Sequence, residues 1–289
     1  MNDTSKAMYW TAAENGRVRC LICPHRCLIA DGAFGICGTR GNAGGRLTAR
    51  GYGRVSSIAL DPIEKKPLYM FKPGKYVLSI GGYGCNLRCP FCQNHEISMN
   101  GIHVGEKGQS YTPEEIAALA IRTAPDGNIG VAYTYNEPLI NYEFLYDCAA
   151  LVQAVGFHNV IVTNGFINRG PLESLLPFID AMNIDLKGFT GGFYKKIGGQ
   201  LEVVMDTIAL SHKLCHVEVT TLVIPGENED DIEAIARWLS SISPDIPLHL
   251  TRFFPRYQYS GREATPGHTI QRLRETASKY LKNVFTGNM

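Results

Sequence analysis

The sequence lacks the long apolar stretches that mark membrane proteins and secreted proteins. No apolar run approaches the ~20 residues of a membrane-spanning helix. The first ten residues, MNDTSKAMYW, contain no apolar core of a signal peptide. The chain also has little net charge, and a value of +1 at pH 7 provides no overall attraction for nucleic acid or an anionic membrane. We therefore expect a cytoplasmic protein that binds neither nucleic acid nor membrane.

What is present is an ordinary globular composition with an unusual number of thiols. Hydrophobic residues make up 45% and charged residues 19% of the 289 residues, which suits one large α/β domain with a small appendage. The chain has nine cysteines. In a reducing cytosol, so many thiols favour metal or redox chemistry over disulfides.

The central motif is a loop with three cysteines. Residues 79–94 read SIGGYGCNLRCPFCQN and place Cys85, Cys89 and Cys92 at the spacing C-x3-C-x2-C, after an apolar run and a glycine-rich turn. Thiolate sulfur is the usual ligand of iron–sulfur clusters, so three cysteines can hold three corners of a [4Fe–4S] cluster and leave one iron open. The alternatives are a zinc knuckle or buried core thiols, although zinc sites mostly use paired C-x2-C units.

A second group of cysteines precedes this loop. Cys20, Cys23, Cys27 and Cys37 have the spacing C-x2-C-x3-C-x9-C, which allows a closed site with four thiolates, and His25 can replace one of them. Zinc and a second iron–sulfur cluster both fit, and disulfides are a minor alternative. We predict a Cys-rich metal-binding region at residues 1–70, where the metal stabilises a segment too short to bury its own core.

From residue 71 to 289, strand and helix patterns alternate six times. Strands are predicted at 76–82, 129–134, 158–163, 179–184, 217–223 and 247–251, and helices begin after them near residues 112, 142, 171, 201, 229 and 269. This order predicts an α/β fold, a partial (β/α)6 TIM-type barrel. Barrel enzymes place their chemistry at the carboxyl ends of the strands, so polar residues there are candidates for the site.

Polar residues follow three of the predicted strands. Asn136 and Glu137 suit recognition of an ammonium group, although a helix cap suits Asn136 nearly as well. Asn164 can contact a ligand or shape a turn. Asp185 and Lys187 alternate onto one face, with a surface ion pair as the alternative. By contrast, the charged residues at 61–66 are expected in a solvated turn, with the rim of the site as the alternative, and Cys148 and Cys215 are expected in the core.

The Cys85 loop resembles the signature of the radical S-adenosylmethionine (SAM) enzymes. Further segments are similar to the AmmeMemoRadiSam radical SAM proteins, a group related to pyruvate formate-lyase activating enzymes. These segments read CLICPHRC at 20–27, DPIEKKPL at 61–68, GCNLRCPFCQN at 84–94, YTYNEP at 133–138 and DLKG at 185–188. The resemblance covers nearly the whole chain and implies the radical SAM barrel.

The resemblance implies a [4Fe–4S] cluster whose open iron binds SAM. Reductive cleavage of SAM gives methionine and a 5′-deoxyadenosyl radical, which abstracts hydrogen from a glycine Cα of a protein partner or from a small molecule. Flavodoxin or ferredoxin is the implied electron donor. The substrate is left open, and so are two alternatives: a second cluster at the N-terminal cysteines for electron transfer or sulfur donation, and a metal-binding scaffold without catalysis.

The resemblance also assigns cofactor contacts to single residues. SAM is expected to lie near Asn94 at the end of the loop, with Phe91 and Ile224 beside adenine. Asn136 or Glu137 is expected at the amino group, although YNEP departs from the glycine-rich acidic motif usual in the family. Asp185 and Lys187 are expected at the carboxylate and ribose, and Asn164 near them. His249 is expected near the deoxyadenosyl group, with a core histidine as the alternative.

Overall fold

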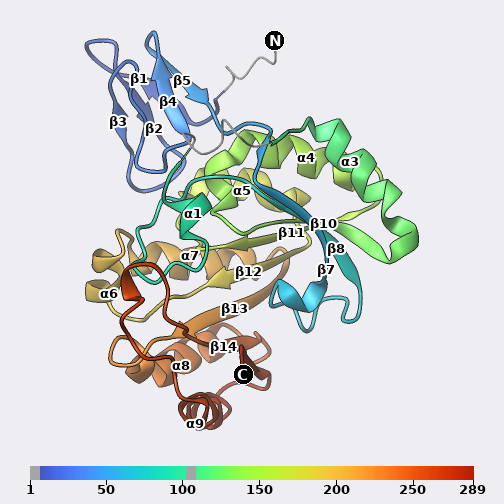
Figure 1. The fold of residues 1–289 in the computed structure, drawn as a ribbon, viewed down its shortest axis with the longest axis vertical. Coiled ribbons are helices and arrows are strands. Elements are labelled where there is room, and N and C mark those ends of the chain that lie inside the picture. The colour runs from blue at the N-terminus through green and yellow to red at the C-terminus, as the bar shows by residue number, and fades with distance from the viewer. Residues whose placement is uncertain (1–6, 102–108) are drawn as a thin grey trace.

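The core of the computed structural model, which describes residues 7–101 and 109–289, is one eight-stranded sheet (Figure 1). Its order is β15-β14-β13-β12-β11-β10-β8-β7, so strands that follow one another in the chain lie side by side. The strands are β7 (Ser57–Pro62), β8 (Tyr76–Gly81), β10 (Asn128–Thr134), β11 (His158–Thr163), β12 (Ala181–Asp185), β13 (His216–Val223), β14 (Leu248–Arg252) and β15 (Val284–Gly287). All neighbours pair in parallel except β7, which runs antiparallel to β8. The predicted partial barrel is confirmed.

Helices connect the parallel strands and cover the outside of the sheet (Figure 1). They are α1 (His95–Ser98), α3 (Pro113–Arg122), α4 (Tyr142–Ala154), α5 (Arg169–Leu175), α6 (Gly191–Lys196), α7 (Leu201–Ser211), α8 (Ile232–Ile242) and α9 (Gly267–Ala277). α3 begins with a capping box, in which the Thr112 hydroxyl accepts from the Glu115 N–H and the Glu115 carboxylate accepts from the Thr112 N–H. The short helix α6 was not predicted, because two of its six residues are glycines.

The segment after β7 closes the amino ends of the barrel strands. Ile63 and Leu68 pack with Val77, Ala132, Val160 and Ala181, which lie in β8, β10, β11 and β12. The next residues are tied down by a buried carboxylate of β13, because Glu218 accepts hydrogen bonds from the N–H groups of Tyr69 and Met70. The segment therefore covers the end of the barrel opposite to the carboxyl ends of the strands, where barrel enzymes bind their ligands.

The N-terminal residues form small antiparallel sheets beside the barrel, in the upper left of Figure 1. One sheet contains β1 (Trp10–Ala12), β2 (Val18–Cys20) and β3 (Leu28–Ile29), and the other β4 (Arg40–Ala43) and β5 (Arg46–Ala49). β6 (Arg54–Val55) pairs with β9 (Gln109–Ser110). β5 pairs antiparallel with the strand before it, β4, whereas β7 joins the main sheet. The boundary at residue 70 stays a prediction, although β7 lies before it.

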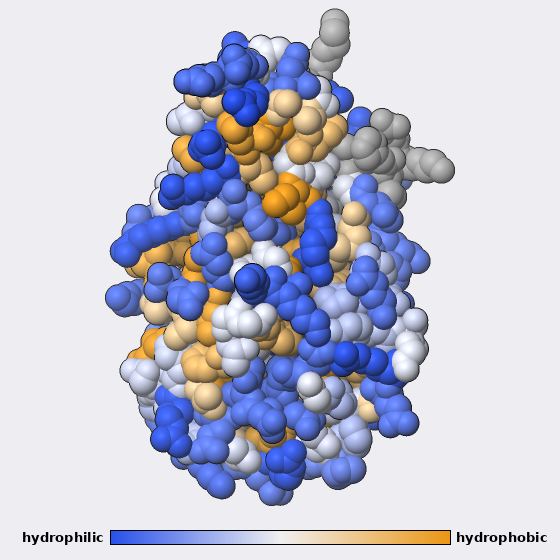
Figure 2. All heavy atoms as spheres, turned by 90° about the vertical axis from the view of Figure 1, so that its left-hand side faces the viewer, coloured by the Kyte–Doolittle hydropathy of each residue, from blue (hydrophilic) through white to orange (hydrophobic). Residues whose placement is uncertain are grey.

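The face shown in Figure 2 is mostly hydrophilic, with apolar residues visible between the polar ones. Among the residues with a described structure, no helix is both long and apolar enough to cross a bilayer.

Candidate functional site

The loop that carries Cys85, Cys89 and Cys92, called the cluster loop below, begins where β8 ends. Close contacts require glycine at two of its positions. Gly84 has φ +82°, and a side-chain carbon there would lie 2.4 Å from the carbonyl oxygen of Cys37. At Gly82 such a carbon would lie 2.9 Å from Nδ2 of Asn141. The loop is therefore pressed between the N-terminal region and the start of α4, which fixes its path.

The thiols of Cys85, Cys89 and Cys92 lie within electrostatic reach of one another. Burial raises the pKa of each, to about 12 for Cys89, and for Cys85 the neighbouring Glu137 and the other two thiols raise it further. The ammonium of Lys187 acts in the opposite direction on Cys89. Lys187 also acts to lower the pKa of Cys92, so the site holds three neighbouring soft donors with a cation near two of them.

This donor set fits an iron–sulfur cluster better than a single ion. Across residues 7–101 and 109–289, no group of three or more His, Cys, Asp or Glu side chains is placed to hold one metal ion. A cubane cluster has a different requirement, because each thiolate binds a different iron. Cys85, Cys89 and Cys92 would hold a [4Fe–4S] cluster with one iron lacking a protein ligand. Their assignment as ligands stays a prediction.

Two predicted ligand contacts, Asn136 after β10 and Asn164 after β11, instead brace the loop. Asn136 accepts from the N–H of Gly82 at 2.9 Å and donates to the carbonyls of Tyr83 and Gly84 at 3.0 and 3.1 Å. Asn164 donates to Oδ1 of Asn86 at 2.9 Å and lies 3.6 Å from the sulfur of Cys85. Their amides are therefore engaged by the protein, and the structure favours a role in shaping the cluster loop.

The carboxylate of Glu137 is buried and fully engaged. It accepts from the Thr163 hydroxyl at 2.7 Å and from the N–H groups of Asn164 and Leu139 at 2.8 and 3.0 Å. Burial raises the pKa of Glu137 to about 7. The carboxylate thus links the ends of β10 and β11, and neither Asn136 nor Glu137 has an unused side chain for an ammonium group.

Asp185 and Lys187 are two predicted contacts that remain accessible at the carboxyl end of the sheet. Asp185 is the last residue of β12 and Lys187 lies two residues beyond it, and the two form an ion pair at 2.9 Å, with 34% and 17% of their side chains exposed. Burial disfavours the ammonium, but Asp185 and Cys89 outweigh this and raise the pKa of Lys187. A fixed cation and a carboxylate next to the thiols can bind a zwitterionic or hydroxylated ligand.

Of three other predicted contacts, one is exposed and two are buried. Asn94 is exposed near the loop and donates to the carbonyl of Tyr135 at 2.7 Å, while Phe91 is buried between Phe193 and Tyr259. Ile224 is 0% exposed, so its side chain offers no surface to a ligand.

His249 occupies the position of a core histidine. Its ring is 2% exposed, packs against Tyr69 and Phe285, and its Nε2 lies 2.6 Å from the buried carboxylate of Glu218. Glu218 also holds the plug at the amino ends of the strands. The structure therefore favours the structural alternative for His249 over a place beside the deoxyadenosyl group.

The solvated turn expected at residues 61–66 is wrong for two of its residues. Asp61 and Lys66 are 7% and 2% exposed and form an ion pair at 2.9 Å. Asp61 also accepts from the phenol of Tyr135 at 2.7 Å, and the Lys66 ammonium lies 4.5 Å from the centre of that ring. Tyr135 has φ +70°, where non-glycine residues are strained. Such strain is common at functional sites. The sequence gives one sign of this group of Asp61, Lys66 and Tyr135: the segment YNEP, which begins with Tyr135, stands where the family usually has a glycine-rich motif.

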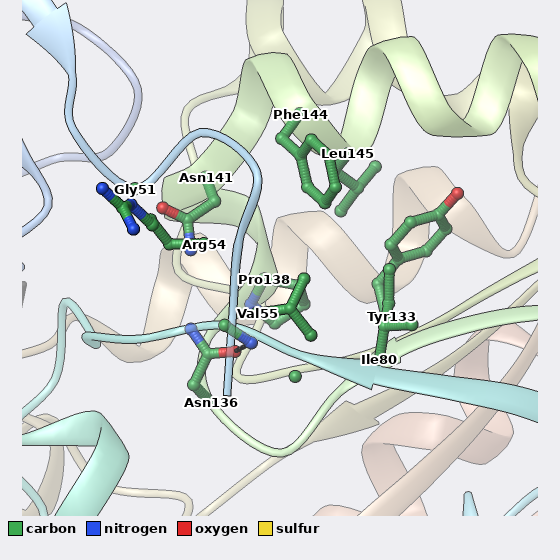
Figure 3. Close-up of a pocket in the computed structure, with 12 residues that line it drawn as sticks. Gly51, Arg54, Val55, Ile80, Tyr133, Asn136, Pro138, Asn141, Phe144 and Leu145 are labelled. Carbon is green, nitrogen blue, oxygen red and sulfur yellow. Dashed lines mark hydrogen bonds between the residues drawn. The ribbon is translucent and has the colours of Figure 1, made fainter. Parts of the chain in front are cut away.

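A pocket lies behind the glycine turn, on the side of β8 that faces the helices (Figure 3). Its polar end contains Arg54, Asn136 and Asn141, and its apolar end includes Tyr133 and Phe144. Asn136 therefore lines this pocket and also holds the backbone of the cluster loop.

The four N-terminal cysteines are brought together in the structure. Cys20, Cys23, Cys27 and Cys37 line one cavity, which also includes His25 and Arg40. The Nε2 of His25 lies 2.7 Å from the carbonyl oxygen of Asn86 in the cluster loop, so this nitrogen is engaged outside the group of thiols. Metal binding at this cavity stays a prediction.

Comparison with known proteins identifies relatives along most of the chain. An uncharacterized protein of Methanocaldococcus jannaschii, MJ0808, is 42% identical over 98% of this chain and 85% of that protein. A putative glycyl-radical enzyme activating enzyme from the same organism, MJ1632, is 26% identical over 70% and 77% of the two chains. The pyruvate formate-lyase-activating enzyme of Clostridium pasteurianum is 31% identical over 50% and 63%.

Solved structures show the same fold at low sequence identity. SuiB of Streptococcus suis bound to S-adenosylmethionine has a TM-score of 0.54 and 14% identity, with 71% of this chain and 48% of that chain covered. Methylornithine synthase (PylB) has a TM-score of 0.50 and 16% identity, over 75% and 73%. The model of the radical SAM superfamily matches residues 79–239, which run from the cluster loop to α8. With this match over more than half of its length, the chain belongs to the radical SAM superfamily.

Proposed function

We propose that this radical SAM enzyme cleaves SAM reductively at a [4Fe–4S] cluster held by Cys85, Cys89 and Cys92, and abstracts hydrogen from its substrate. The observation that carries the proposal is the arrangement of the three thiols. They lie on one braced loop at the carboxyl end of β8, and the accessible Asp185–Lys187 pair lies next to them.

The cluster and SAM supply the radical chemistry, and the residues of the chain hold and shield it. Lys187 presents a point charge that suits the carboxylate of SAM, and Asp185 can accept from the ribose hydroxyls. Asn136 and Asn164 hold the loop backbone and the side chain of Asn86 in place. With the opposite end of the barrel plugged, substrate approaches from the carboxyl ends of the strands.

The narrower assignment is to the AmmeMemoRadiSam proteins, with a glycine Cα of a protein partner as the hydrogen donor. It is supported by the motifs at residues 20–27, 61–68 and 185–188 and by likeness to a putative and a named activating enzyme at 26% and 31% identity. A small-molecule substrate is the second candidate. Flavodoxin or ferredoxin is the proposed electron donor. A second centre at the N-terminal cysteines, zinc or iron–sulfur, belongs to the same proposal.

The decisive experiment measures 5′-deoxyadenosine after anaerobic reconstitution, reduction with dithionite and addition of SAM. We expect the nucleoside from the wild-type chain, none from Cys85→Ala, and wild-type amounts from Cys148→Ala, which removes a core thiol in α4. A fully loaded wild-type protein that makes no 5′-deoxyadenosine would favour the metal-binding scaffold.

The hydrogen donor is identified by isotope transfer. Cell extract from cells grown on α-deuterated glycine is separated into macromolecules and small molecules, and each fraction is added to the assay. Deuterium in 5′-deoxyadenosine from the macromolecular fraction alone supports glycyl-radical activation. Deuterium from the small-molecule fraction alone rejects it in favour of a small substrate.

A further inference from the structure

The four N-terminal thiols form a second site, separate from the loop that carries Cys85, Cys89 and Cys92. Cys20 ends β2, Cys23 and Cys27 lie in the following loop, and Cys37 lies just before β4. Although they span eighteen residues of the chain, all four line the same cavity. The two remaining cysteines, Cys148 in α4 and Cys215 before β13, do not line it.

Arg40, which also lines this cavity, carries a buried donor that lacks a partner. Its side chain is 2% exposed, and its two terminal nitrogens bind the Glu143 carboxylate at 2.8 and 3.0 Å and the Met8 carbonyl at 2.8 Å. Its Nε has no hydrogen-bond partner among the residues described. An unpaired buried donor costs about 1–3 kcal/mol. The orphaned Nε therefore indicates an acceptor, and metal-bound thiolate sulfur in the same cavity would satisfy it.

The walls of this cavity touch the backbone on both sides of Cys85. The carbonyl of Cys37 packs so tightly against Gly84 that only glycine fits there. On the other side of Cys85, the carbonyl of Asn86 is held by His25 at 2.7 Å. The ring of His25 also packs edge-on against Phe166, at 5.2 Å between ring centres.

A third contact comes from a guanidinium group of the cluster loop. Arg88 donates to the carbonyl of Cys85 at 2.8 Å and also to the carbonyl of Ile36, which immediately precedes Cys37. The segments that carry the N-terminal thiols thus pack directly against the cluster loop. A shift of either one changes the hydrogen bonds of the other.

We propose that a thiophilic metal centre bound by Cys20, Cys23, Cys27 and Cys37, with Arg40 donating to one of its sulfurs, holds the cluster loop in the conformation that binds the [4Fe–4S] cluster. This inference rests on the proposed metal binding at the N-terminal cysteines. As placed, the thiols do not meet the requirement of a single ion, so zinc would draw them together, whereas a cluster would place each sulfur on its own iron. Either centre fixes Cys37 against Gly84 and His25 against Asn86.

The first test asks whether the centre exists. Metal is measured in the triple variant Cys85→Ala, Cys89→Ala, Cys92→Ala, prepared anaerobically with zinc and iron both supplied. About one zinc per chain identifies a single-ion site, and about four irons per chain identify a second cluster. Neither metal bound in stoichiometric amount overturns the inference, even where the wild-type chain makes 5′-deoxyadenosine.

The second test asks whether the N-terminal metal centre stabilises the cluster loop. In Cys23→Ser we expect the catalytic cluster to be lost to a chelator at least tenfold faster than in the wild type, and its electron paramagnetic resonance spectrum to lose the change caused by SAM. Cys215→Ala is the matched control and should behave as the wild type. A Cys23→Ser protein that keeps wild-type cluster retention and the SAM-dependent spectrum refutes the coupling.

His25→Phe covers the case in which Cys23→Ser does not fold. The variant keeps all four thiols and removes the bond to the Asn86 carbonyl. We expect it to retain the N-terminal metal while its catalytic cluster is lost several-fold faster. A His25→Phe protein that retains both metal centres as well as the wild type does contradicts the proposed coupling through His25.

Arg40→Lys keeps the positive charge but removes Nε. We expect this variant to retain less of the N-terminal metal than the wild type, and unchanged retention would reject Nε as a donor to the metal-bound sulfur.

Discussion

Tyr135 offers the sharpest test of how the barrel positions the cluster loop. Its backbone has φ +70°, its phenol donates to Asp61 at 2.7 Å, and its carbonyl accepts from Asn94 at 2.7 Å. The side chain thus holds a strained residue between β10 and the cluster loop. Substitution by Phe, Ala and Gly separates the phenol hydrogen bond from the backbone strain.

The structure gives the expected order of stability. A hydrogen bond to a charged group contributes about 1.5–3 kcal/mol. Since Lys66 and Lys65 still pair with Asp61 in Tyr135→Phe, we expect a loss near the lower end, about 1.5 kcal/mol. The left-handed conformation costs a residue with a side chain roughly 1–2 kcal/mol, and glycine loses about 0.5–1 kcal/mol more chain entropy. Tyr135→Gly should therefore be more stable than Tyr135→Ala by roughly 0.5–1 kcal/mol, although both lose the ring.

The assay is urea unfolding of the cluster-free chain under anaerobic, reducing conditions, followed by circular dichroism. SAM binding by the reconstituted variants is measured in parallel, because Tyr135 lies next to Asn136, which binds the glycine turn. Two outcomes would refute the reasoning: wild-type stability of Tyr135→Phe, or Tyr135→Ala at least as stable as Tyr135→Gly.

Three further predictions address the site, the plug and a helix end. Lys187→Ala should weaken SAM binding by roughly ten- to a hundredfold, as expected for a lost charged contact; unchanged affinity with the cluster intact would mean that the SAM pocket is misplaced. Burial alone would raise the pKa of Glu218, but hydrogen bonds from His216 and His249 and from backbone N–H groups lower it to about 2, below the 4.5 of a free glutamate. The stability it contributes is therefore present above pH 4.5 and is lost as pH falls toward 2, by up to about 3 kcal/mol; Glu218→Gln should flatten this part of the unfolding free energy against pH, and an identical profile would contradict the assignment. Thr112→Ala should cost about 1 kcal/mol in urea unfolding through loss of the α3 cap, and a change below a few tenths would show that this helix end frays without cost.

The sequence alone identified the features that depend on neighbours in the chain. The spacing of Cys85, Cys89 and Cys92 after an apolar strand is local, and so is the alternation of strand and helix patterns that predicts a parallel barrel. The α3 capping box was predictable for the same reason, because its two partners are three residues apart. The edge strand β15 was missed because a strand of four residues has too little pattern to recognise.

Only the tertiary structure decided which polar side chains remain available to a ligand. Asp61 and Tyr135 are 74 residues apart and His25 and Asn86 are 61 apart, so no local pattern reports their pairing. Asn136 and Glu137 follow a strand end as a ligand contact should, yet loop backbone and neighbouring strand ends occupy their hydrogen-bonding atoms. A buried polar group must find a partner wherever the fold supplies one. The sequence therefore indicates which residues can do chemistry, and long-range packing determines which of them are left free to do it.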